Sequence, residues 1–200
     1  TQITINGISQ ISELGGLKDI RFQGFMTTLN LPSFSELDLS GVNTLSSNPI
    51  LFENAFINRS DYSDVRNINL SNTSFWEVNQ GVSTFTVNIS KYTKLKKINI
   101  SNSCVTSLSL PNASLSELNI TNSTIEKITL SSQPFLSSID FFGCNKLTNV
   151  VIENCSKLKS LNLSNLQDLQ EISITGCIEL EELIIANNPK LESFSISGCP

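Results

Sequence analysis

The sequence of 200 residues contains no histidine, and few of its residues are charged. Without an imidazole, catalytic triads that use histidine, histidine general bases and the common zinc and iron sites are excluded. Only 16% of the residues are charged, and the net charge of −5 disfavours non-specific binding to nucleic acid. The chain also lacks any run of about 18 apolar residues, so we predict no transmembrane helix. Serine, threonine and asparagine must therefore cover much of the surface.

What the sequence has instead is a short internal repeat with the pattern L-x-x-L-x-L, whose period is roughly 10 or 11 residues. Ten such modules run from Leu95-x-x-Ile98-x-Ile100 onward, and all thirty positions of the three columns are apolar. The second and third columns lie two residues apart, which is the period of a β-strand. Small polar residues stand between them, so one side of each strand faces water. Each module is therefore predicted to be a short strand and a corner, without room for a helix.

The charged residues indicate how many modules make one coil. If two modules make a coil, Asp168 lies between Lys146 and Lys190, and opposite charges face each other on adjacent rungs. Three further pairs follow the same rule: Lys157–Glu179, Lys159–Glu181 and, where the coil is shorter, Lys97–Glu117. We therefore predict a mainly β fold, a leucine-rich-repeat-like β-solenoid with two short parallel strands per coil of roughly 20–22 residues. A coil of three modules is the alternative.

The first half of the chain follows this pattern less regularly. Residues 1–44 read as irregular repeats, 45–63 as an inserted apolar loop segment and 64–200 as the regular solenoid, all within one continuous domain. Since the chain starts at Thr1 and ends at Pro200, we expect it to be a fragment of a longer one.

Two segments of the regular part carry a resemblance to a known family. KLTNVVIENC at 146–155 and KLKSLNLSNL at 157–166 resemble the strand segment of leucine-rich repeats. The nearest subclass is the BspA-type surface repeats, because 155–163 (CSKLKSLNL) is similar to their first half and 53–56 (ENAF) to their second. After residue 94 the sequence departs from that subclass, since both halves of each coil look like strands. The resemblance implies a non-catalytic repeat module at a cell surface.

Cysteine, asparagine and glycine recur where the coils turn. Under the two-strand coil, Cys155, Cys177 and Cys199 stack on one side and Cys144 lies on the other. Buried corner residues explain them better than a metal or redox ladder, because no C-x-x-C spacing is present. We predict no metal and no cofactor.

Left-handed corner conformations are expected at Asn102, Asn112, Asn122, Asn154, Asn165 and Asn187 and at Gly143, Gly176 and Gly198. The frequent Asn-x-Ser/Thr sequons read as a result of composition, with glycan attachment as the alternative.

Outward-facing apolar residues are the candidate partner-binding positions. Phe142, Val151 and Ile184 stand where other modules carry serine, threonine, asparagine or aspartate. Under the two-strand coil, Phe142 and Ile184 share a face. Trp76 is an aromatic candidate beside the inserted segment, which itself contains Phe52 and Phe56.

These observations favour a binding module over an enzyme. No nucleophile–base pair, phosphate loop or metal constellation is recognisable. The first hypothesis is a surface-displayed, extracellular module that binds a protein or a glycan in adhesion or recognition. The alternative is a structural module of a virion or fibre, which acts as a rigid spacer or self-associates through the solenoid ends. A non-catalytic appendage of an enzyme is the third possibility.

Overall fold

The structure, a computed structural model, describes residues 36–38, 43–44, 65–72, 74–77, 81–83, 85–90, 92–112 and 115–200. All the regular secondary structure within these ranges consists of β-strands. One sheet has seven strands in the spatial order β1 (Glu36–Asp38), β3 (Asn67–Asn69), β7 (Lys97–Asn99), β9 (Glu117–Asn119), β11 (Ser138–Asp140), β13 (Ser160–Asn162) and β15 (Glu182–Ile184). A second sheet has six strands in the order β6 (Phe85–Asn88), β8 (Val105–Ser109), β10 (Lys127–Ser131), β12 (Asn149–Glu153), β14 (Glu171–Thr175) and β16 (Ser193–Ser197).

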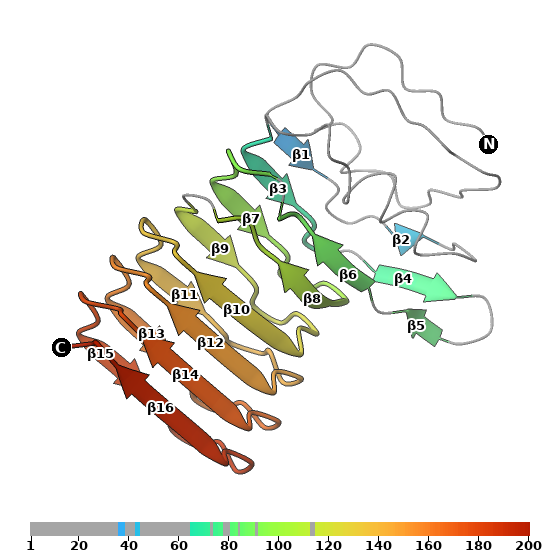
Figure 1. The fold of residues 1–200 in the computed structure, drawn as a ribbon. Coiled ribbons are helices and arrows are strands. Elements are labelled where there is room, and N and C mark those ends of the chain that lie inside the picture. The colour runs from blue at the N-terminus through green and yellow to red at the C-terminus, as the bar shows by residue number, and fades with distance from the viewer. Residues whose placement is uncertain are drawn as a thin grey trace.

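From β6 onward consecutive strands alternate between the two sheets, and the chain winds as a β-solenoid of about five turns (Figure 1). Every pairing inside the two sheets is parallel. Ser138 pairs with Ser160, and Ser160 pairs with Glu182, which gives roughly 22 residues per coil. Lys97 pairs with Glu117, so that coil is slightly shorter. The predicted coil of two strands is confirmed, and the coil of three modules is wrong.

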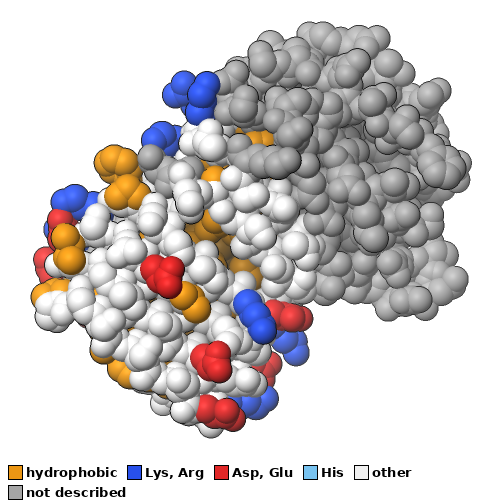
Figure 2. All heavy atoms as spheres, viewed as in Figure 1, with side chains coloured by type: hydrophobic (Ala, Val, Ile, Leu, Met, Phe, Trp, Pro, Cys, Tyr) orange, Lys and Arg blue, Asp and Glu red, His pale blue; other side chains and the backbone are white. Residues whose placement is uncertain are grey.

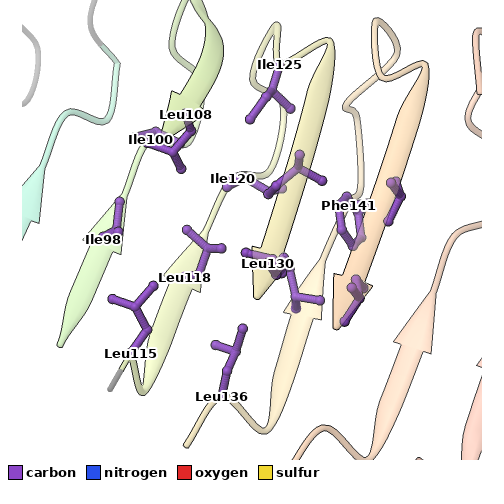
Figure 3. Packing of buried hydrophobic residues seen from close by; sticks show 14 of the residues in the cluster. Ile98, Ile100, Leu108, Leu115, Leu118, Ile120, Ile125, Leu130, Leu136 and Phe141 are labelled. Atoms are coloured by element: carbon purple, nitrogen blue, oxygen red, sulfur yellow. The ribbon is translucent and has the colours of Figure 1, made fainter. Parts of the chain in front are cut away.

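The core lies between the two sheets and is built from the three apolar columns of the repeat. Within β10, Ile128 and Leu130 are buried, whereas Lys127 and Thr129 are exposed. Because each strand points alternate side chains inward, the columns of successive coils merge into one continuous cluster. Figure 3 shows Leu118 from β9 and Leu130 from β10 projecting into this shared interior. Neither sheet could bury its apolar face without the other.

The corners use the left-handed backbone conformation that the sequence predicts. Five of the six predicted asparagines have φ between 52° and 60°: Asn102, Asn122, Asn154, Asn165 and Asn187. Asn112 is not among the positive-φ residues that the structure describes, whereas Asn72 and Ser132 are. The three predicted glycines have φ of 76°, 67° and 63°. At Gly143 the missing side chain also leaves space for Asn122 of the adjacent coil, since a Cβ on residue 143 would lie 1.9 Å from Asn122 Oδ1.

Three of the predicted opposite-charge pairs form ion pairs, among them Asp168 and Lys190. Lys97 Nζ lies 2.7 Å from Glu117 Oε1, and Lys157 forms an ion pair with Glu179. Lys159 and Glu181 lie on adjacent rungs, where the Glu181 N–H donates to the Lys159 carbonyl at 2.8 Å.

The first described coils are less regular than those that follow. Asn67 pairs with Glu36 on one side and with Lys97 on the other, so both of these register steps are longer than the later ones. The longer step after β3 holds an excursion, in which β4 (Ser74–Glu77) pairs antiparallel with β5 (Gly81–Ser83). A short strand, β2 (Asn43–Thr44), completes this three-stranded sheet. The inserted segment predicted at 45–63 lies outside the described residues.

Candidate functional site

The outer face of the seven-stranded sheet carries a wide hollow. This groove, which we call the sheet groove, has a volume of about 730 Å³ and extends from β3 to β11. Its lining includes the outward residues of these strands, among them Asn69, Asn119, Ser138 and Asp140. The size falls within the range of ligand-binding clefts, but the outward side chains are polar. A ligand that fits this surface must form hydrogen bonds with it.

One column of asparagine and aspartate runs along the sheet groove. Asn69, Asn99 and Asn119 are aligned by the strand register, and Asp140 and Asn162 continue the column. In each asparagine, Oδ1 accepts a hydrogen bond from the backbone N–H two residues ahead, at 3.0–3.2 Å. The carbonyl oxygens therefore close the corners, and the amide NH₂ groups are the donors that remain.

The same geometry gives several of the Asn-x-Ser/Thr sequons a structural role. The hydroxyl two residues ahead also donates to the asparagine Oδ1, at 2.8 Å for Ser101 to Asn99 and 2.6 Å for Ser164 to Asn162. Ser90 donates to Asn88 in the same way on the six-stranded sheet, at 2.7 Å. Asparagine side chains often cap turns through this bond. At these positions the sequon thus has a structural role in closing the corner.

A second hollow lies at the corner where the chain leaves β9, β11 and β13. This corner pocket has a volume of about 660 Å³ and meets the sheet groove at Asp140. Phe142 lines it and is 72% exposed. The Phe142 N–H donates to Asp140 Oδ1 at 2.9 Å, so this aspartate closes its corner as the asparagines do.

The structure places the predicted partner-binding residues at separate positions. Phe142 and Ile184 both lie on the side of the seven-stranded sheet, as predicted, but β13 separates their strands. Val151 is half-buried on β12 of the other sheet, between Thr129 and Ser173. Trp76 pairs through its backbone with Val82. Phe52 and Phe56 lie outside the described residues, so the six candidates are not shown to form one surface.

Two exposed apolar residues were not among the candidates predicted from the sequence. Phe135 is 60% exposed and Ile178 is 65% exposed. The ammonium of Lys96 lies 5.7 Å from the centre of the Phe135 ring, a cation–π contact. Phe135 stands immediately before Leu136, the first apolar residue of its module. In the later modules the corresponding position is charged, as at Lys146 and Lys157. An aromatic residue in this otherwise charged column is the signal that could have identified Phe135. Figure 2 shows hydrophobic side chains as separate spots on the visible face.

The cysteines pack as corner residues. Cys144, Cys155 and Cys177 are fully buried, and Cys199 is partly exposed; all are free thiols. Burial raises the pKa of the Cys144 and Cys155 thiols and raises that of Cys177 to about 11. These thiols are therefore protonated at neutral pH and poor nucleophiles. Across the described part of the chain, no three His, Cys, Asp or Glu side chains gather where they could hold a metal ion.

The comparisons with known proteins assign no relative. A scan against protein-family models gives no match, and a search of curated proteins gives no match either. Among the described residues, no helix is long and apolar enough to cross a membrane.

Proposed function

We propose that this chain is a non-catalytic recognition module, displayed outside the cell or at its surface, that binds a protein or a glycan. The sheet groove is the observation that carries the proposal. It presents a rigid, polar, hollowed surface, and the β-solenoid fixes the spacing of its side chains by the parallel register. The resemblance of the repeat to BspA-type surface repeats supports the same role.

The electrostatics of the groove favour a polar ligand without a strong net charge. Lys97 and Glu117 cross it as an ion pair at 2.7 Å, and both side chains are more than half exposed. Their charges therefore offset each other locally. Asp140 adds one carboxylate next to the amides of Asn119 and Asn162. Such a surface offers many hydrogen bonds and few apolar contacts.

Binding to arrays of glycans and extracellular proteins tests this proposal. Ser138→Arg places a bulky cation in the sheet groove, and Ser173→Arg makes the matched change on the six-stranded sheet. We expect saturable binding that Ser138→Arg abolishes and Ser173→Arg retains. Absence of saturable binding on both arrays, or equal effects of the two substitutions, would contradict the proposal.

A structural role in a virion or fibre is the second candidate, and the regular stacking of the coils favours it. The strands of both main sheets pair in parallel register from one coil to the next, which is the architecture of a rigid spacer. Light scattering distinguishes the two roles, since a spacer or fibre module forms trimers or filaments, whereas a recognition module stays monomeric.

A further inference from the structure

The coil that contains Phe142 departs at two positions from the pattern of the coils on either side of it. Four other coils close this corner with asparagine followed two residues later by serine or threonine, as in Asn119–Thr121 and Asn162–Ser164, whereas the last coil has Ile184 and Ala186 there. Here the corresponding residues are Asp140 and Phe142. The corner still closes through the backbone bond, so its geometry does not require either change. Local departures of this kind are expected where a site has a function.

Phe142 gains little stability from its position. Its side chain is 72% exposed, so most of the favourable burial that phenylalanine offers is not realised. Among the described residues that line the corner pocket, Phe142 is the only one with an apolar side chain. The other lining residues are asparagine, aspartate, serine and glycine. One exposed ring in polar surroundings is too small an apolar area to hold a hydrophobic peptide segment. It is a suitable size for a single flat ligand with one apolar face.

Hydrogen-bonding groups surround the ring. Asp140 uses Oδ1 for the Phe142 N–H, and within the described structure its second carboxylate oxygen has no hydrogen-bond partner. The exposed side chain of Asn145 is likewise unpaired within the described residues. Asn162 accepts from Ser164 through Oδ1, which leaves its amide NH₂ as a donor. The corner pocket therefore offers one strong acceptor and several amide groups around an aromatic face.

A pyranose ring matches this combination. Hydroxyls around a sugar ring both donate and accept hydrogen bonds, whereas its axial C–H groups form an apolar face. The face of an aromatic ring is electronegative and attracts such C–H groups. Asp140 is the only charged residue among the described ones that line the pocket, so an anionic sugar would be repelled. The chemistry thus selects a neutral sugar.

We infer that the corner pocket binds a neutral hexopyranose unit of a glycan, with the sugar stacked on Phe142 and its hydroxyls bonded to Asp140, Asn145 and Asn162. This inference rests on the proposed recognition function, and it names the ligand class and the anchoring residues. Because the pocket meets the sheet groove at Asp140, further units of the same glycan extend over the seven-stranded sheet.

The test uses the whole chain from Thr1 to Pro200 and defined sugars. The probes are methyl glycosides of glucose, galactose, mannose and N-acetylglucosamine, and neutral oligosaccharides of two to six units. Saturation-transfer NMR detects contact, and calorimetry gives the affinity of each oligosaccharide that binds. We expect Phe142→Ala to weaken binding at least about tenfold and Asp140→Asn to weaken it about three- to tenfold, since asparagine keeps the corner bond.

Phe135→Ala is the matched control, because it removes another exposed ring, which lies outside the pocket. It should leave sugar affinity unchanged, and circular dichroism should show that all three variants remain folded. If binding is lost with Ser138→Arg but not with Phe142→Ala, the inference fails and the recognition function stands. If acidic sugars or proteins bind at Phe142 in place of neutral sugars, the inference also fails. If no probe or array ligand binds at all, both proposals fail.

Discussion

Lys190 donates a hydrogen bond from Nζ to Asp168 Oδ1 at 2.7 Å, although the two residues are 22 apart in the sequence. Each residue stands immediately before the first leucine of its module, one coil from the other. The bond therefore connects two adjacent coils of the solenoid at the surface. Lys146 lies one coil further down and adds to the positive potential at Asp168.

The first prediction concerns this ladder. Asp168→Lys places three lysines on successive rungs and should destabilise the fold, because like charges then face each other. Adding Lys190→Glu should restore part of the lost stability. Urea unfolding of the single and double variants at low and high salt measures the coupling, which should shrink at high salt because surface charges are screened. Zero coupling at low salt would contradict the ladder.

The second prediction is the pH dependence of the same pair. The hydrogen bond from Lys190, followed by its charge, holds the pKa of the Asp168 carboxyl below its ordinary value. A carboxyl with a lowered folded pKa stabilises the fold above its unfolded pKa, which is about 3.9. That contribution is lost as the pH falls through the folded value. The coupling between Asp168 and Lys190 should therefore be constant from pH 5 to 7 and vanish in acid, and an increase on acidification would be inconsistent with this.

The third prediction tests the core. Leu161 is 1% exposed and sits in a column with Ile139 and Leu183. Leu161→Ala should lower the free energy of unfolding by about 2–5 kcal/mol, because it leaves a cavity between the sheets. Ser160→Ala on the outer face is the control and should change it by less than about 0.5 kcal/mol. Similar losses for both variants in denaturant unfolding would show that the columns are assigned wrongly.

The apolar columns of the repeat were the most predictable part of the fold. The second and third columns lie two residues apart, which fixes the strand period. Opposite charges one coil apart fix the number of strands per coil. The exposed Phe135 was not predicted, because the column that it occupies was read only for its charges. The excursion through β4 and β5 was missed because the repeat pattern is weak there, and Thr84 stands where later modules have leucine.

The candidate site was predictable only in part. The outward position of Phe142 followed from the repeat pattern, since it replaces a polar residue. The role of Asn99 and Asn162 in closing the corners did not follow, because Asn-x-Ser/Thr is also the glycan-acceptor pattern. The sequence places residues on a face, but a hollow depends on how strongly successive coils twist and bend. The sheet groove therefore became visible only in the structure.

The fourth prediction compares two corner glycines. Gly143 has φ of 76°, and an added Cβ would lie 1.9 Å from Asn122 Oδ1, so Gly143→Ala combines backbone strain with a steric clash. Gly198 has φ of 63°, but the nearest atom to its Cβ would be 3.4 Å away. We expect Gly198→Ala to cost about 1–2 kcal/mol and Gly143→Ala to cost more. Thermal unfolding of the two variants checks the order, and a smaller loss for Gly143→Ala would refute the packing of Asn122.

The fifth prediction concerns thiol reactivity along the stacked column of Cys155, Cys177 and Cys199. Burial raises the pKa of Cys177 to about 11, so at pH 8 only about one molecule in a thousand carries its reactive thiolate. Cys199 is partly exposed. Iodoacetamide at pH 8 should therefore modify Cys199 at least about tenfold faster than Cys177, as followed by peptide mass spectrometry. In urea, where burial is lost, the two rates should converge. Equal rates in the folded protein would mean that Cys177 is not buried in the corner.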